Sequence, residues 1–282
     1  ERPHWVVVVG DVNSTLACSL VTSKLRFELT CRLAHVEAGL RSRDWRMPEE
    51  VNRVLTDRLS DALLTPSPEG ELNLRAEGIE GEGVTFVGNV MIDTLLDQLP
   101  HARELDMPGR LGVERGQYAV VTLHRPSNVD HPEALRSVLE GLGRVAETYP
   151  VVFPVHPRTR KQVEVFGLED LLEPLKALPP VSYREMIGAV AEARVVLTDS
   201  GGLQEETTVL GVPCVTLREQ TERPVTVDVG TNRLVPWPIT IRGILNTVNA
   251  ALEDDTASAS VPEGWDGQAS RRVVETLLRL RP

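Results

Sequence analysis

Aromatic residues, lysine and long apolar runs are all scarce in this chain of 282 residues. Phe, Trp and Tyr make up 4% of the residues, so we expect an aliphatic core of Val, Leu, Ile and Ala. No apolar run approaches the roughly 18–20 residues that a membrane-spanning helix needs. The first residues, from Glu1 to His4, lack the pattern of a signal peptide. We therefore expect a cytoplasmic protein that does not enter a membrane.

Cysteine and positive charge are also limited. The three cysteines, Cys18, Cys31 and Cys214, form no C-x-x-C pair, which argues against a disulfide framework or a zinc site and predicts buried free thiols. Lys and Arg number 30 against 41 Asp and Glu, a formal net charge of −11. Because nucleic-acid binding rests on a basic surface, this balance argues against a nucleic-acid partner. Phosphate ligands remain possible, since a few clustered arginines can bind them.

What the chain does contain is a regular alternation of short apolar runs with segments of helical periodicity. Runs rich in Val and Leu that end at Gly or a polar residue are typical of buried strands in a parallel sheet. Predicted strands cover residues 5–9, 33–36, 62–65, 84–87, 118–123, 151–155, 175–178, 194–198 and 213–217, and predicted helices cover residues 13–26, 49–60, 68–77, 132–148, 158–166, 183–191, 202–210, 241–252 and 268–281. Asn13 or Ser14 is the expected cap of the first helix. The repeated strand–loop–helix unit predicts an α/β fold.

The alternation weakens between residues 91 and 117, a segment with several Pro and Gly residues. We place a domain boundary in this segment. The predicted domains are an N-terminal Rossmann-like domain at residues 1–105 and a C-terminal Rossmann-like domain at residues 116–265. Residues 266–282 are expected to form a helix that packs back on the first domain. Two such doubly wound domains would bind a nucleotide at the C-terminal ends of their strands.

Polar residues follow several predicted strands, at Asp11, Glu37, His124, His156 and Asp199. A single residue of this kind is usually a helix cap or a turn residue. Open parallel sheets, however, bind their ligands at this edge. Five such residues along two sheets therefore indicate a binding or catalytic site.

The strongest local pattern is DSGGLQEE at residues 199–206, where a predicted strand ends and a helix begins. The backbone from Ser200 to Gly202 suits a phosphate, because free N–H groups and the positive end of the helix dipole meet there. The alternative is an ordinary turn with Ser200 as the helix cap. Glu205 and Glu206 follow one turn later and point about 100° apart. One of them could accept both hydroxyls of a ribose, or both could belong to a solvated helix face.

Arginine and histidine side chains offer further contacts for an anion. Arg223 lies in the segment TERP after the last predicted strand, where it could pair with a phosphate; the alternative is a surface salt bridge. His124, Arg125 and His156 offer further cations or proton carriers, although a single His is more often structural. The chain lacks the motifs GxGxxG, GxxxxGK[ST], HExxH and GxSxG. A dehydrogenase, a P-loop enzyme, a zincin and an α/β-hydrolase therefore have no support.

Six motifs occur together and in order: HVEAGLRS at 35–42, PEEVNR at 48–53, VGNVMID at 87–93, LHR at 123–125, DSGGLQEE at 199–206 and TERP at 221–224. With this combination the chain resembles the non-hydrolysing UDP-N-acetylglucosamine 2-epimerases, from about Val6 to the last helix. The resemblance implies a GT-B architecture of two Rossmann-like domains with the active site between them. It also implies that UDP-N-acetylglucosamine and UDP-N-acetylmannosamine are interconverted by elimination and re-addition of UDP. The expected assembly is a homodimer that UDP-N-acetylglucosamine activates at a second site.

The resemblance also implies roles for residues at matching positions. Asp11, Glu37 and Glu49 match the family's catalytic carboxylates. His124 is the fourth expected catalytic residue and is expected to contact the phosphates of the substrate. The expected UDP contacts are Ser200, Gly201, Gly202, Glu206 and Arg223. The family reaction requires neither a metal nor a redox cofactor, so we expect neither.

Two departures from the family pattern affect these expectations. The family commonly continues His-Arg with Arg-Glu-Asn, whereas this chain continues with Pro126, Ser127 and Asn128. That segment borders the family's second nucleotide site, where Arg125 and His156 are the candidate allosteric residues, so we predict weak or absent activation. The chain also lacks the family's opening strand, which ends in GTRPE, and this predicts an incomplete N-terminal domain.

Three alternatives to this epimerase remain open at the level of sequence. A GT-B glycosyltransferase would share the nucleotide site at residues 200–202 and Glu206 but would not need carboxylates at Asp11, Glu37 and Glu49. A hydrolysing epimerase would release UDP and free N-acetylmannosamine. A nucleotide-sugar binding module would have no turnover. The motifs also leave open which carboxylate is the base and which is the acid.

Overall fold

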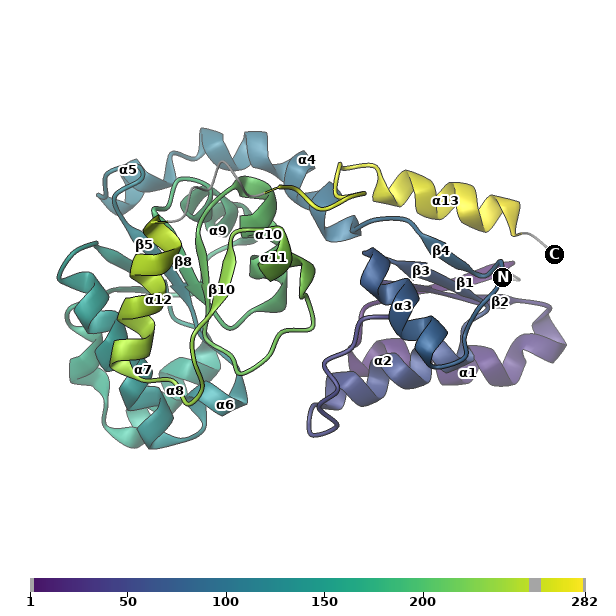
Figure 1. The fold of residues 1–282 in the computed structure, drawn as a ribbon, viewed down its shortest axis with the longest axis horizontal. Helices are drawn as coiled ribbons and strands as arrows, with labels where there is room; N and C mark the ends of the chain where they lie inside the picture. Colours follow the sequence, from purple (N-terminus) through teal and green to yellow (C-terminus); the bar gives the residue numbers. More distant parts are fainter. Residues whose placement is uncertain (1–2, 254–259, 281–282) are drawn as a thin grey trace. The chain divides into compact units, whose positions relative to one another are not determined.

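The computed structural model describes residues 3–253 and 260–280. By its contacts the chain divides into two compact units. Unit 1 consists of Glu1–Thr94 together with Pro262–Pro282, and unit 2 consists of Leu95–Val261. Each unit is built around one parallel β-sheet (Figure 1). Residue 281, at the end of the last predicted helix, lies outside the described residues.

Unit 1 contains a sheet with the strand order β1-β2-β3-β4, in which all neighbouring strands are parallel. Its strands are β1 (Trp5–Val9), β2 (Arg32–Val36), β3 (Ala62–Thr65) and β4 (Val84–Phe86). The connecting helices are α1 (Asn13–Leu29), α2 (Pro48–Leu59) and α3 (Pro68–Ala76). Each strand is added on the same side of the preceding one, so right-handed crossovers place the three helices on one face of the sheet (Figure 1).

The last helix of the chain, α13 (Ala269–Arg279), covers the opposite face of this sheet (Figure 1). Val273 of α13 packs against Val36, Leu64 and Val87. At one end of the helix, the indole N–H of Trp5 donates to a backbone carbonyl of the last helical turn at 3.1 Å. The C-terminal helix therefore belongs to unit 1 and completes its second covering layer.

The limits of the two units differ from the expected domain limits. Unit 2 begins at Leu95, inside α4 (Val90–Glu104), and it includes residues 106–115, which were expected to separate the domains. In that segment, Met107 is buried and packs in one cluster with Tyr118 and other core residues of unit 2. The division at Leu95 thus falls within a helix, at a position that no Gly or Pro marks in the sequence.

The sheet of unit 2 has the strand order β10-β9-β8-β5-β6-β7. Its strands are β5 (Ala119–Thr122), β6 (Val151–Pro154), β7 (Lys176–Leu178), β8 (Val195–Thr198), β9 (Cys214–Thr216) and β10 (Asn232–Leu234). The strand order grows in one direction from β5 and in the other direction from β8, which makes the sheet doubly wound. Ligands bind to such sheets beyond the C-terminal ends of the strands, at the point where the order reverses. In unit 2 that point lies between β5 and β8.

Helices cover both faces of the unit 2 sheet. They are α5 (Met107–Leu111), α6 (Pro126–Val129), α7 (Pro132–Ala146), α8 (Pro157–Phe166), the 3₁₀ turn η1 (Glu169–Leu172), α9 (Tyr183–Val190), α10 (Gly201–Leu210), α11 (Val225–Asp228) and α12 (Ile241–Glu253). Val121 and Leu197 pack on the face of α7 and α12, whereas the alternating residues Val120 and Val196 pack on the face of α9. Burial of each such side chain contributes about 1.5–3 kcal/mol, and this aliphatic core holds the strand ends in place.

Every predicted strand and helix is present, with ends that differ by a few residues, so the predicted α/β class is confirmed. The sequence did not predict α4, α5, α6, η1, α11 or β10. Apart from α4, these elements have three to five residues, too few for a periodic pattern. Within the described ranges, no helix is both long and apolar enough to cross a membrane.

The expected cap of α1 is wrong. The N-cap residue is Val12, and its side chain makes no capping hydrogen bond. Asn13 is already helical, and its Oδ1 accepts a hydrogen bond from Asn52 Nδ2 at 3.0 Å. The short polar side chain is therefore used to join α1 to α2 instead of closing its own helix.

The cysteine prediction holds for two of the three residues. Cys31 and Cys214 are buried free thiols, whereas Cys18 is an exposed free thiol. Cys18 lies on α1, where Leu20 and Val21 are also about half exposed, at 46% and 57%. On α1, the apolar character of a residue thus does not predict that its side chain is buried.

Candidate active site

Two left-handed residues shape the ends of β1 and β2 in unit 1. Gly10 and Glu37 have φ of 66° and 71°, and the Gly10 amide donates to the Val36 carbonyl at 3.1 Å. A Cβ added to Gly10 would lie 3.4 Å from Glu37 Oε2, so the Glu37 carboxylate lies against the end of β1, where Asp11 follows. For a residue with a side chain this conformation costs about 1–2 kcal/mol, and such strain is concentrated at functional sites.

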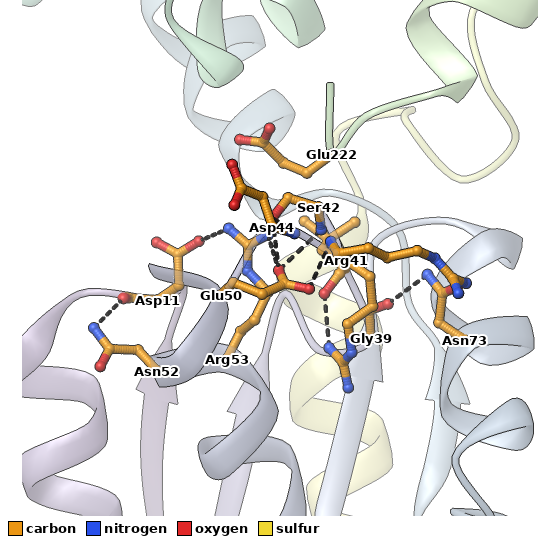
Figure 2. Close-up of polar contacts among 12 residues, drawn as sticks. Asp11, Gly39, Arg41, Ser42, Asp44, Glu50, Asn52, Arg53, Asn73 and Glu222 are labelled. Atoms are coloured by element: carbon orange, nitrogen blue, oxygen red, sulfur yellow. Dashed lines mark hydrogen bonds and ion pairs between the residues drawn. The ribbon is translucent and has the colours of Figure 1, made fainter. Parts of the chain in front are cut away.

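Arg53 of α2 connects two carboxylates at this edge of the sheet (Figure 2). It forms ion pairs with Asp11 and, at 3.0 Å, with Glu50. The Arg53 side chain is 3% exposed and that of Asp11 is 27% exposed. Asp11 can therefore reach a ligand, while the guanidinium that fixes it stays inside the protein.

Glu49 and Glu50 are adjacent in α2 but have different environments. Glu50 is buried and accepts hydrogen bonds from the Ser42 amide at 2.9 Å and from the Arg43 amide at 2.8 Å. It therefore anchors the loop before α2. Glu49 is half-buried and points about 100° away from Glu50, but it shares a helix face with Arg53 four residues later.

A buried histidine supports the backbone before Asp11. His35 of β2 is fully buried, with Nδ1 2.6 Å from Asp57 Oδ1 and Nε2 2.9 Å from the Gly10 carbonyl. Because a carbonyl can only accept, Nε2 donates to Gly10, and Nδ1 pairs with the Asp57 carboxyl group. Asp57 also pairs with Arg41 at 2.7 Å. This network fixes Gly10 and therefore the start of the segment that carries Asp11.

The sequence analysis did not single out Arg53, Glu50, His35 or Asp57. A polar His within an otherwise apolar strand was the available signal, because a buried imidazole needs partners. Arg53 and Glu50 lie within the PEEVNR motif, but the motif does not show which of its charged side chains turns inward. That distinction depends on how α2 packs on the sheet.

In unit 2, candidate residues gather where the strand order reverses. His124 follows β5 and Asp199 follows β8. His124 Nδ1 lies 3.0 Å from Asp199 Oδ1, and the Arg125 amide donates to Asp199 at 2.8 Å. Burial would raise the pKa of Asp199, but the His124 ring and the backbone amides hold it below its usual value. Because Asp199 occupies Nδ1, Nε2 is the His124 nitrogen left for proton transfer.

The two candidate allosteric residues, Arg125 and His156, lie at this same edge. The rings of His156 and His124 have centroids 5.6 Å apart. Burial lowers the pKa of His156, and the nearby His124 lowers it further. His156 Nδ1 accepts from the backbone amide two residues later at 3.2 Å, so it also caps α8. Arg125 lies 3.8 Å from a carboxylate oxygen of Glu222.

The glycine turn before α10 has the geometry of an anion site. Ser200 is the N-cap residue, yet its side chain makes no capping hydrogen bond, so the alternative of a side-chain cap is not seen. Arg223 is 7% exposed and pairs with Glu205 at 3.1 Å and with Glu222 at 3.0 Å. A Cβ on Gly201 would lie 3.0 Å from Glu222 Oε1 and 3.2 Å from the guanidinium carbon of Arg223. Glycine thus allows the Arg223–Glu222 ion pair to lie against the first turn of α10, where N–H groups and the helix dipole favour an anion.

The second glutamate of the motif, Glu206, has a separate environment. Glu206 is 5% exposed and accepts a hydrogen bond from the Tyr183 hydroxyl at 2.8 Å. Burial raises the pKa of Glu206, and the bond from Tyr183 opposes this. Among the described residues no group of three or more His, Cys, Asp or Glu side chains is placed to hold a metal ion.

Comparison with known proteins places these residues in a family. The sequence model of the family described as UDP-N-acetylglucosamine 2-epimerase matches residues 1–278. The chain belongs to this 2-epimerase family. The resemblance inferred from the six motifs is thereby confirmed.

Relatives of the 2-epimerase family match most of the chain. The UDP-N-acetylglucosamine 2-epimerase of Methanocaldococcus jannaschii is 45% identical over 243 residues, covering 83% of this chain and 65% of the relative. The UDP-2,3-diacetamido-2,3-dideoxy-D-glucuronate 2-epimerase of Pseudomonas aeruginosa is 41% identical over 285 residues, covering 99% of this chain and 76% of the relative. The chain thus spans slightly less than two thirds of the first of these proteins.

Solved 2-epimerase structures share the fold. The crystal structure of the M. jannaschii UDP-GlcNAc 2-epimerase in complex with UDP-GlcNAc and UDP matches with a TM-score of 0.89 at 40% identity, covering 99% of this chain and 76% of that chain. The Neisseria meningitidis enzyme bound to UDP-GlcNAc matches with a TM-score of 0.86 at 30% identity, covering 99% of this chain and 77% of that chain. These matches confirm the predicted GT-B-like class with two parallel sheets.

Proposed function

We propose that this protein is a non-hydrolysing UDP-N-acetylglucosamine 2-epimerase. The observation that carries the proposal is that Asp11 and Glu37 follow neighbouring strands at one sheet edge of unit 1, and we assign Glu49 of α2 to the same group. Arg53 pairs with the first of them. A protein that only binds a nucleotide sugar, or a glycosyltransferase that shares the nucleotide site, has no need for three carboxylates at this edge.

The chemistry explains why several carboxylates are useful. A carboxylate removes the C2 proton, the C1–O bond breaks, and its electron pair leaves with UDP, which gives a C1–C2 double bond. UDP oxygen then attacks C1 again while a carboxylic acid returns a proton to the opposite face of C2. Inversion therefore needs a base on one face and an acid on the other.

Departure of UDP requires stabilisation of the diphosphate charge, and unit 2 offers it. We assign the diphosphate to the turn of Ser200, Gly201 and Gly202, with Arg223 as the paired cation. His124, held by Asp199 through Nδ1, is the assigned phosphate-side residue able to exchange a proton. Positioned donors and cations of this kind lower the barrier where negative charge develops.

The two relatives are named for different substrates, UDP-N-acetylglucosamine and UDP-2,3-diacetamido-2,3-dideoxy-D-glucuronate. Both sugars are therefore candidate substrates of this protein. We propose UDP-N-acetylglucosamine as the substrate. NMR analysis of products from both sugars tests this choice. UDP-N-acetylmannosamine is the expected product; free N-acetylmannosamine with UDP would indicate the hydrolysing reaction, and turnover of the glucuronate alone would contradict the proposed substrate.

Replacing Arg223 with Ala should weaken UDP binding by about 1.5–3 kcal/mol, the usual contribution of a hydrogen bond to a charged group. Titration calorimetry measures this directly. Arg242→Ala is a matched control, because Arg242 is exposed on α12 and its removal changes the net charge equally. Equal UDP affinities for the Arg223 variant and the unaltered protein would remove Arg223 from the site.

We also predict weak or absent activation by UDP-N-acetylglucosamine. Residues from Pro126 to Val129 form the short helix α6 directly after Arg125, in place of the charged pair of the family pattern. Turnover that starts from UDP-N-acetylmannosamine should therefore not depend on added UDP-N-acetylglucosamine. A strict requirement for the added compound would contradict this prediction. A homodimer remains an expectation from the resemblance, and a cytoplasmic location remains an expectation from the sequence.

A further inference from the structure

A tyrosine and a buried glutamate link two helices of unit 2 outside the glycine turn. Tyr183 is the first residue of α9, and Glu206 lies in the second turn of α10. The Tyr183 hydroxyl donates to Glu206 Oε1 at 2.8 Å. Tyr183 is 42% exposed and Glu206 is 5% exposed. The bond therefore joins a ring at the surface to a carboxylate in the interior.

The charged form of Glu206 depends on the hydrogen bond from Tyr183, because no cation among the described residues neutralises the carboxylate. Its neighbour Glu205 pairs with Arg223 at 3.1 Å, whereas Glu206 has no ion pair among the described residues. The titratable or charged residues on the other elements packed against α10 are Cys214 on β9, Asp228 on α11 and Arg233 on β10. A buried carboxylate without a cation favours its neutral form unless donors stabilise the charge.

The donor is well suited to this task. Burial raises the pKa of Tyr183, and the Glu206 carboxylate raises it further, so the hydroxyl keeps its proton at neutral pH. The start of α9 is fixed by a capping box in which Ser182 and Glu185 exchange hydrogen bonds. Arg110 in turn lies 3.1 Å from Glu185. The Tyr183 hydroxyl is thereby held in reach of the carboxylate.

We propose that Tyr183 is a positioning residue of the nucleoside site, whose hydroxyl keeps Glu206 ionised and oriented to accept the ribose hydroxyls. This role rests on the proposed function, in which Glu206 contacts the ribose. An ionised carboxylate offers about four lone-pair positions. One of them is used by Tyr183, and the rest can accept both hydroxyls of a diol. A protonated carboxyl group would present an O–H at one oxygen and lose this capacity.

The first test follows Glu206 itself, in the protein without nucleotide. Carboxyl-carbon NMR gives the titration midpoint of Glu206, and its signal is assigned by its loss in Glu206→Gln. Tyr183→Phe removes only the hydroxyl and should raise the midpoint by about one pH unit, because the lost hydrogen bond favoured the charged form. Tyr149→Phe is the matched control, since the structure gives Tyr149 no bond to Glu206, and should leave the midpoint unchanged. An unchanged midpoint in Tyr183→Phe overturns the proposal.

The second test follows UDP binding against pH by calorimetry. As the pH falls, a carboxylate with a raised pKa takes up its proton at a higher pH than an ordinary glutamate. Protonated Glu206 cannot accept both ribose hydroxyls, so UDP affinity should decline as Glu206 becomes protonated. In Tyr183→Phe this decline should begin about one pH unit higher, and it should be missing in Glu206→Gln, alone or combined with Tyr183→Phe. Titration of the diphosphate is common to all these proteins and cancels in the comparison.

The two tests separate the two ideas. Loss of UDP affinity by the same factor at every pH in Tyr183→Phe would mean that the hydroxyl does not act through Glu206 and would overturn the proposal. A shifted Glu206 midpoint in a protein that binds no UDP at any pH would instead contradict the proposed nucleotide site. A shifted midpoint with a shifted UDP profile supports both.

Discussion

Replacing Glu37 with Gln should lower the rate of 2-epimerisation by about 10²–10⁴-fold, the usual contribution of a positioned acid or base. The amide keeps nearly the same shape but cannot take up a proton. Glu37 has a left-handed conformation, and its carboxylate lies against Gly10 at the end of β1. Turnover of UDP-N-acetylglucosamine under saturating conditions is the measurement. UDP affinity should change little, because the diphosphate is assigned to residues of unit 2.

Two further variants sharpen this result. Asp11→Asn should also reduce turnover by about 10²–10⁴-fold, but it weakens the ion pair with Arg53 as well, so its stability must be measured alongside. Glu82→Gln is the matched control, because Glu82 is exposed before β4 and should keep full activity. Full activity in Glu37→Gln would remove this residue from the catalytic group.

Asp57→Ala should lower the free energy of unfolding of unit 1 by about 3–5 kcal/mol, as expected when one partner of a buried ion pair is removed. Asp57 is 1% exposed and pairs with His35 at 2.6 Å and with Arg41 at 2.7 Å. It also accepts from the Gly39 amide at 3.1 Å. Its removal leaves the buried Arg41 guanidinium with less compensation and the buried His35 ring without its Nδ1 partner. Guanidinium denaturation, compared at an unchanged m-value, gives the difference.

Glu275→Ala provides the surface comparison within the same unit. Glu275 pairs with Arg271 at 2.8 Å on α13, but the two side chains are 59% and 73% exposed. Such a pair contributes about 0.3–0.5 kcal/mol. If Asp57→Ala destabilised unit 1 no more than Glu275→Ala does, the buried network would not be what holds Gly10 and the start of the active-site segment.

The sequence was sufficient for nine of the ten described strands, all but β10, because their apolar runs are short and uninterrupted. The run that became β1 was predicted at its observed limits, Trp5–Val9. The glycine turn after β8 was also recognisable, because the Ser-Gly-Gly segment directly follows an apolar run and precedes a helical pattern. In the structure, a side chain at Gly201 would contact Arg223. The order of the strands was not predicted. This order makes β5 and β8 neighbours, and the residues that follow them therefore lie together. Strand order arises from contacts between segments far apart in the chain.

Side-chain environments were predictable only in part. Glu49 and Glu50 are identical neighbours in the sequence, and only the packing of α2 shows that Glu50 turns inward to the Ser42 loop. Tyr183 belongs to none of the recognised motifs, because its importance comes from a bond to Glu206, 23 residues later. His35 carried a signal, as a polar residue in an apolar strand, but its partners became visible only with the fold.

The most direct test of the account is epimerisation in deuterated water. Elimination and re-addition require the C2 proton to leave the sugar, so UDP-N-acetylmannosamine formed from UDP-N-acetylglucosamine should carry deuterium at C2. Substrate recovered after the reverse reaction should carry it as well. Proton and carbon NMR detect the label at this position. Deuterium at C2 of the epimerised product is the predicted result, and an epimerised product that retains its original hydrogen at C2 would contradict the mechanism.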